Sequence, residues 1–203
     1  MCAETLPKEK IPVESIEVSE IYNPTISGHG IMDVKSIEKG KKTMKLCTTL
    51  IAVRDMERSL QFYHDLFDQE VTLDLGWNKT LFCGLTLQAH FDELAGFPAE
   101  TMKYHPNTME LYFETENFDD FLARLHKYPE VELLHEPKTF PWLQRGVRIY
   151  DPDGHLIEVS ESMYSVACRL FRQGKSVQET AELIRHPLHA VEAWHEEYQS
   201  GVH

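Results

Sequence analysis

Cysteine and histidine are the first residues to examine, because they supply many of the nucleophiles and metal ligands of enzymes. The cysteines are scattered and contain no Cys-x-x-Cys pair (Cys2, Cys47, Cys83 and Cys168). This spacing argues against a thiolate zinc site and against a small disulfide scaffold. Most of the eleven histidines are also scattered, and several fall in expected helices where they would face water (His64, His126, His186, His189 and His195). The chain has no Gly-x-Ser-x-Gly motif, P-loop or dinucleotide fingerprint.

Tryptophan and arginine offer a second kind of chemistry, the binding of a small organic molecule. Trp77 and Trp142 lie in or beside expected strands, where they could wall a pocket or simply belong to the core. Arg145 and Arg148 lie on one expected strand. They could meet an anionic group of a substrate, or they could pair with acids at the surface.

Composition excludes several classes of protein. The chain has 203 residues, of which 42% are hydrophobic, so it can fill a core and is not disordered throughout. Its 20 basic and 33 acidic residues give a net charge of −13, which repels nucleic-acid phosphates. The first residues, MCAETLPKEK, lack the apolar centre of a signal peptide, and no apolar stretch approaches the about 18 residues that cross a bilayer. We therefore expect a cytoplasmic protein without nucleic-acid or membrane partners.

The elements that position these residues begin at residue 46. Residues 46–53 form a β-branched apolar run that predicts a strand, and Asp55 then stands where a helix N-cap belongs. The following helix carries one apolar face, with Met56, Leu60, Tyr63 and Phe67. Short strands are expected near residues 69–74, 79–83 and 84–90. Together these segments predict a β-α-β-β-β unit.

The same order of elements recurs from residue 109. An alternating strand over 109–115 precedes a helix that Asn117 caps, and strands are expected near 130–135, 145–150 and 154–160. The turn sequence DPDG stands at 151–154, where Pro fixes φ and Gly accepts a positive φ. The predicted fold class is α/β (α+β), with paired βαβββ modules over residues 44–162 that form a cupped sheet.

Two segments flank this predicted domain. Residues 1–43 hold a single aromatic residue and no apolar periodicity, so we expect a flexible arm, and Met44 is a hypothetical start of the native protein. Residues 163–203 predict three helices whose spacing is like that of a helix-turn-helix. The third helix contains Glu192, Glu196 and Glu197 and neither Lys nor Arg, so it would repel DNA. We expect the tail to pack on the domain or to contribute to a dimer contact.

Two stretches of sequence carry a family resemblance. VRDMERSLQFY in the first unit and WLQRGVRIYDPDGHLIEV in the second resemble the glyoxalase/bleomycin-resistance/dioxygenase family, the vicinal-oxygen-chelate superfamily, over about residues 45–162. The resemblance implies that two modules curl into an open cup that holds a small molecule. It also implies a divalent metal at the floor of the cup in many members, and a homodimer.

The resemblance implies metal-ligand positions that fall on Thr48, Gln88, Glu110 and Glu158, one on the opening and one on the closing strand of each module. Each position has the parity that faces the cup. Thr is a poor ligand for a divalent cation, so the implied set is Gln88, Glu110 and Glu158. Oxygen ligands suit Mg²⁺ or Mn²⁺ better than Zn²⁺, although Ni²⁺ and Zn²⁺ stay open. His90, two residues after Gln88, could add an imidazole.

Glu158 and Glu110 are the predicted catalytic residues. Without a metal the two carboxylates would repel each other, which favours protonation of one and a role in acid–base chemistry. The resemblance implies proton transfer on a small oxygenated molecule by a lactoylglutathione-lyase-like enzyme of the lyase or isomerase type. Thr48, Trp142 and Arg148 are the predicted substrate-binding residues. One alternative is a metal-free protein that binds a planar or cationic compound. The other is a ligand-sensing regulator whose tail contacts DNA or a partner.

Overall fold

The computed structural model describes residues 44–201 of the chain. The expected arm at residues 1–43 lies outside the described residues, and the start at Met44 stays a hypothesis. None of the helices between residues 44 and 201 is both long and apolar enough to cross a membrane.

The first module consists of four strands and one helix: β1 (Thr49–Ala52), α1 (Met56–Phe67), β2 (Val71–Asp74), β3 (Asn78–Leu81) and β4 (Leu85–Gln88). The strand order is β1-β4-β3-β2, with β1 parallel to β4 and the other pairs antiparallel. Helix α1 begins as predicted, because the Asp55 carboxylate accepts a hydrogen bond from the Arg58 amide at 3.1 Å. It ends at Asp68, whose φ of 54° closes the helix in the left-handed conformation.

The second module repeats this order: β5 (Glu110–Thr115), α3 (Phe118–Leu125), β6 (Leu133–Thr139), β7 (Arg145–Tyr150) and β8 (Leu156–Glu161). The strand order β5-β8-β7-β6 is equivalent to that of the first sheet. Asn117 caps α3 by accepting a hydrogen bond from the Asp120 amide, as predicted. The short helices α2 (Phe91–Ala95) and η1 (Ala99–Thr101) follow the first module and precede the second along the chain. This is the predicted fold of paired βαβββ modules.

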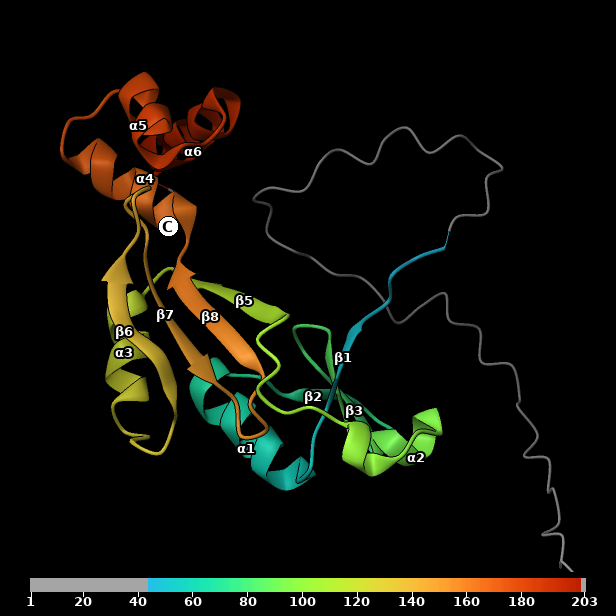
Figure 1. Cartoon of the computed structure of the whole chain (residues 1–203). Coiled ribbons are helices and arrows are strands. Elements are labelled where there is room, and N and C mark those ends of the chain that lie inside the picture. Colours follow the sequence, from blue (N-terminus) through green and yellow to red (C-terminus); the bar gives the residue numbers. More distant parts are fainter. Residues whose placement is uncertain (1–43, 202–203) are drawn as a thin grey trace, which may run out of the picture. The chain divides into compact units, whose positions relative to one another are not determined.

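Helix α1 joins the two modules into one core (Figure 1). Its Phe67 ring lies 4.6 Å from the ring of Phe113, on the apolar face of the second sheet. The buried Tyr63 hydroxyl donates to Asp151 Oδ2 in the DPDG turn at 3.0 Å. Since α1 contacts the apolar faces of both sheets, the polar face of each sheet is turned away from this shared core.

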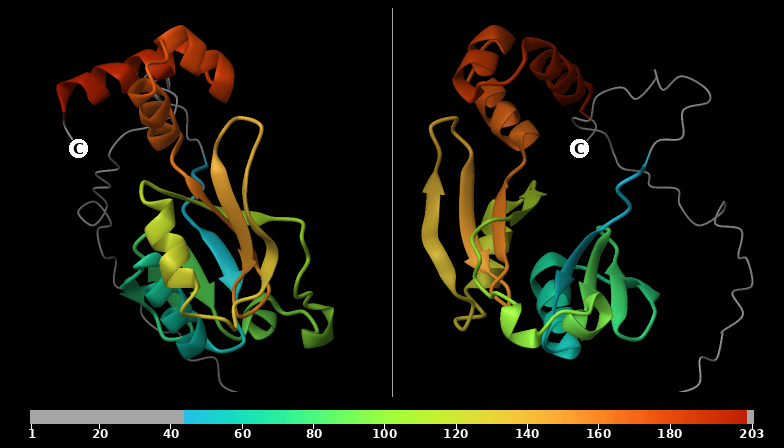
Figure 2. Two further views of the ribbon diagram at one scale, coloured as in Figure 1. Left: turned by 90° about the vertical axis from the view of Figure 1, so that its left-hand side faces the viewer. Right: turned by 45° about the vertical axis from the view of Figure 1, so that its right-hand side comes forward.

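Three helices follow β8 directly: α4 (Met163–Arg172), α5 (Val177–Ile184) and α6 (Leu188–Ser200). They lie at the end of the second sheet where β8 ends (Figure 2). Ser176 and Glu179 form the predicted capping box of α5. Val191 and Trp194 of α6 are buried in a core of the tail's own, against which Trp142 and Leu143 of the β6–β7 loop pack.

Candidate functional site

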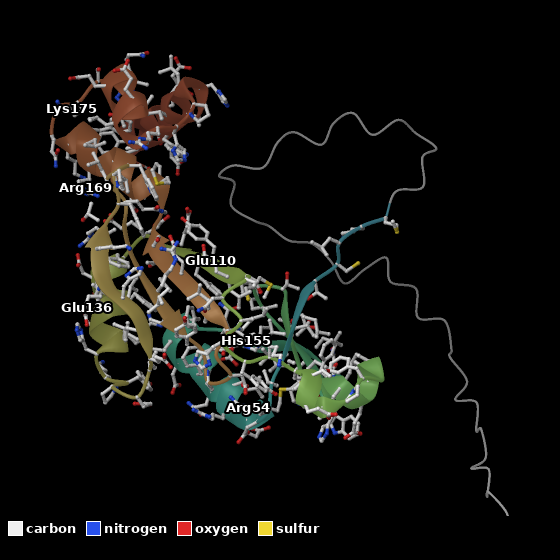
Figure 3. The ribbon with its side chains drawn as sticks, viewed as in Figure 1. Arg54, Glu110, Glu136, His155, Arg169 and Lys175 are labelled. Atoms are coloured by element: carbon white, nitrogen blue, oxygen red, sulfur yellow. The ribbon has the colours of Figure 1, made fainter. Side chains whose placement is uncertain are left out.

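The polar face of the second sheet gathers the predicted carboxylates. Glu110, Tyr112 and Glu114 share one parity of β5, and Glu158 and Ser160 share one parity of β8. Strand pairing places Glu158 between Tyr112 on β5 and Arg148 on β7. Figure 3 labels Glu110 on β5, beside β8.

Arg148 joins the two carboxylates. Its Nε donates to Glu110 Oε2 at 2.9 Å, and its Nη2 pairs with Glu158 Oε2. Ser160 Oγ donates to the other oxygen of Glu158 at 2.8 Å. The Glu158 side chain is only 5% exposed, whereas that of Glu110 is 35% exposed. The repulsion expected between the two glutamates is therefore offset by a guanidinium.

An aromatic wall stands beside these charges. The rings of Phe140 and Trp142 stack with centroids 4.9 Å apart and planes 3° apart. Arg148 Cζ lies 5.5 Å from the Phe140 centroid. Gly146 leaves room for the side chains of Ser160 and Phe140, because a Cβ there would overlap Ser160 Oγ and lie 2.9 Å from Phe140 Cε2.

Gln144 connects the aromatic wall to the sheet. It accepts a hydrogen bond from Trp142 Nε1 at 2.7 Å, and its Nε2 donates to the Tyr112 hydroxyl at 2.8 Å and to the Glu161 carbonyl at 2.7 Å. The Tyr112 hydroxyl in turn donates to Glu114 at 2.9 Å. Partial burial raises the pKa of Tyr112 to about 12, so its phenol is a neutral donor at physiological pH.

The other two implied ligand positions belong to the first sheet. Thr48 Oγ1 donates to the Gly84 carbonyl at 2.7 Å and lies 2.8 Å from Thr86 Oγ1. Gln88 is buried, accepts a hydrogen bond from Asn78 Nδ2 at 2.8 Å and donates to its neighbour's carbonyl. These hydrogen bonds all remain within the first module, whereas Glu110 and Glu158 meet in the second.

His90 does not continue the strand of Gln88 as the sequence suggested. Strand β4 ends at Gln88, and His90 is the N-cap of α2 with a φ of 52°. Its Nδ1 lies 3.2 Å from Glu93 Oε1, and its ring centroid lies 4.4 Å from that of Trp77. The proposed extra imidazole therefore lies at the start of a helix, and the half-exposed Trp77 packs on it.

The donor set as the structure holds it does not fit a divalent cation. Between residues 44 and 201, no group of three or more His, Cys, Asp or Glu side chains could hold a metal ion. A cation bound by Glu110 and Glu158 would have to displace Arg148, which already contacts both carboxylates. The metal site thus stays a prediction, and the chemistry we derive below uses the side chains alone.

Sequence reasoning found part of this site. Arg145 pairs with the exposed Asp119 at 2.8 Å and with the buried Glu161 at 2.9 Å, which favours pairing with acids over contact with a substrate for that residue. Phe140 and Gln144 were missed. Phe140 had no signal because it precedes the recognisable WLQRG stretch, whereas Gln144 lies within that stretch and could have been tested for a role.

Comparison with known proteins agrees with this class of fold. A family model described as a glyoxalase-like domain matches residues 46–164, and the chain belongs to this family. A protein of unknown function from Agrobacterium tumefaciens is 31% identical with a TM-score of 0.52, over 61% of this chain and 98% of that one.

Two further solved structures share the fold at lower identity. A glyoxalase/bleomycin resistance protein/dioxygenase family enzyme from Burkholderia phytofirmans is 17% identical with a TM-score of 0.50, over 57% of this chain and 96% of that one. A hypothetical protein from S. aureus is 18% identical with a TM-score of 0.50, over 59% of this chain and 95% of that one. The comparison with curated proteins gave no match.

Proposed function

We propose that the polar face of the second sheet binds a small planar organic cation and needs no metal ion to do so. The observation that carries this proposal is the charge of the face. Two cations, the Arg148 guanidinium and the Lys138 ammonium beside Phe140, face three carboxylates, those of Glu110, Glu114 and Glu158. Arg148 is already engaged by two of them, so the remaining field attracts a cation rather than an anion.

The aromatic side chains support a flat ligand. The stacked rings of Phe140 and Trp142 stand at the edge of the acidic face, and two cations of the protein, Lys138 and Arg148, lie 5.2 Å and 5.5 Å from the Phe140 centroid. A cation beside such rings gains the attraction of their quadrupoles, which is worth about 0.5–2 kcal/mol. Tyr112, which is 50% exposed, adds a third ring on the same face. The combination favours a planar cation over an aliphatic one.

We further propose that a second copy of the chain completes the site. The polar face is turned away from the shared core, and the ring of Tyr112 on this face is 50% exposed. An aromatic ring exposed beside a binding face suits a surface that another chain covers. We therefore expect a homodimer in sedimentation equilibrium, and a Tyr112→Glu variant should shift it toward the monomer.

The test is a fluorescence titration with ethidium, a planar aromatic cation, in the presence of a chelator. We expect saturable binding that Glu158→Gln weakens about tenfold, since removing one nearby charge is worth about 1–2 kcal/mol. Glu130→Gln is the matched control, because Glu130 is an exposed carboxylate in the turn before β6. The proposal fails if ethidium does not bind, if Glu158→Gln binds as well as the control, or if binding requires added metal.

Glu158 itself supports a second candidate, the proton-transfer enzyme of the lyase or isomerase type. A carboxylate that is almost fully buried and accepts a hydrogen bond from Ser160 is well placed to take a proton from a bound substrate. The ion pair with Arg148 occupies the carboxylate oxygen that a substrate proton would have to reach, so this candidate ranks second. Turnover of the methylglyoxal–glutathione adduct by the full chain, lost in Glu158→Gln and retained in Glu130→Gln, would establish it.

A further inference from the structure

We infer that the C-terminal helices brace the aromatic wall of this site, and that Arg169 on α4 is the positioning residue that fixes it. The loop concerned comprises residues 140–144, between β6 and β7. This inference rests on the proposed function, because the wall is what would select planar cations.

Arg169 connects three parts of the chain. Its Nη2 donates to the Leu143 carbonyl at 2.9 Å and to Glu161 Oε2 at 3.0 Å. Glu161 is buried at the end of β8, and the same carboxylate oxygen accepts the Arg145 amide at 3.0 Å. One guanidinium therefore holds the helix, the loop and the last residue of the strand together. Figure 3 labels Arg169 where α4 meets the ends of the second sheet.

The loop adopts a conformation that needs outside support. Leu143 has a φ of 66°, a left-handed conformation that costs a non-glycine residue about 1 kcal/mol or more. The turn is closed by the Leu143 amide, which donates to the Phe140 carbonyl at 2.9 Å, and by the Phe140 amide, which donates to the Gln144 carbonyl at 2.8 Å. Trp142 and Leu143 both pack against the core of the tail. The tail thus supplies contacts that offset the cost of the Leu143 conformation.

The contacts of Arg169 hold the aromatic wall of Phe140 and Trp142 and do not position the carboxylates. Trp142 stacks on Phe140 and donates its indole N–H to Gln144, so a loop that relaxes loses its flat surface. Glu110, Glu158 and Arg148 lie within strands and keep their ladder contacts. Loosening the brace should therefore reduce selectivity for planar cations more than it reduces attraction for cations in general.

The experiment compares Arg169→Gln with Arg172→Gln in the full chain. Both changes remove one positive charge from α4, and Arg172 is exposed, so it is the matched control. The probes are ethidium and the aliphatic cation tetrapropylammonium, which is measured by competition. We expect Arg169→Gln to weaken ethidium about fivefold and tetrapropylammonium less than about twofold, because the lost contact is with the rings. Arg172→Gln should change neither.

A second measurement follows the loop without any ligand. The indole N–H resonance of Trp142, assigned with Trp142→Phe, reports its hydrogen bond to Gln144. It should move in Arg169→Gln and stay in Arg172→Gln. Leu143→Ala removes the side-chain anchor, leaves α4 unchanged and keeps a residue that is strained at this φ, so it should move the same resonance if the loop depends on the tail. An unmoved resonance in both Arg169→Gln and Leu143→Ala would overturn the role of Arg169 and the tail.

The two measurements separate the two proposals. If the wild-type protein does not bind ethidium, the proposed function fails and the ligand-selecting role fails with it, while the indole resonance still decides the brace. If ethidium binds and Arg169→Gln weakens both probes equally, Arg169 acts on the charges rather than on the wall, and the inference is wrong.

Discussion

Replacing Arg148 by methionine tests the main electrostatic feature of the site, the two ion pairs that Arg148 makes with Glu110 and Glu158. The change keeps an apolar side chain of similar reach but removes the cation that joins Glu110 and Glu158. Glu158 would then be a carboxylate only 5% exposed, with Ser160 as its remaining side-chain partner. Breaking a fully buried ion pair costs about 3–5 kcal/mol, and Arg148 is 24% exposed, so we expect a loss of about 2–3 kcal/mol.

A double-mutant cycle isolates the contribution of the pair. Glu158→Gln alone leaves Arg148 bonded to Glu110 and should cost about 1–2 kcal/mol. In the double variant no unpaired charge is buried, so the combined loss should fall short of the sum by about 1–2 kcal/mol.

The assay is urea unfolding followed by circular dichroism, with a chelator present. The control is Arg124→Met, which breaks an exposed pair with Asp68 and should cost about 1 kcal/mol or less. Additive losses for Arg148→Met and Glu158→Gln would refute the view that Arg148 compensates a buried carboxylate.

Four further outcomes are expected. Gly146→Ala should lose about 1–3 kcal/mol in urea unfolding, because the new Cβ would overlap Ser160 Oγ. Tyr63→Phe should lose about 1–2 kcal/mol, because it removes the hydroxyl that donates to the buried Asp151. Burial raises the pKa of Tyr63 well above its ordinary value of 10.0. Above pH 10.0 the phenol of the unfolded chain loses its proton and that of the folded chain keeps it, so the stability of the folded protein falls as the pH rises. The melting temperature of Tyr63→Phe should therefore fall less steeply above pH 10.0 than that of the wild-type protein. Trp194→Ala should cost about 3–5 kcal/mol as the core of the tail is emptied, a loss that unfolding followed by near-ultraviolet dichroism would detect. Fluorescence anisotropy of a labelled DNA duplex should show no binding at physiological salt, and salt-sensitive binding that disappears with the tail would contradict the charge argument.

The fold could be predicted because its signals are local. Asp55 and Asn117 cap the helices that they were expected to cap, and period-two alternation identified the strands. The same alternation placed Glu110 and Glu158 on one polar face. The alternation could not predict the pairing register that brings Arg148 against Glu110 and Glu158, because it constrains each strand separately.

The misses have equally specific causes. His90 was expected on a strand face, but the strand stops two residues earlier and the chain turns into a helix at a left-handed residue. The conformation of Leu143 had no local signal, because left-handed positions are usually Gly, Asn or Asp. Its loop is held by Arg169, 26 residues further along the chain. Contacts over such separations are set by packing rather than by local sequence.

The most direct test of the central claim is a crystal structure of the protein grown with Mn²⁺ and measured at the manganese absorption edge. We predict the Arg148 guanidinium between the carboxylates of Glu110 and Glu158, with no anomalous peak between them. An anomalous peak bound to both carboxylates, with Arg148 turned away, would show that a metal rather than an arginine organises the site.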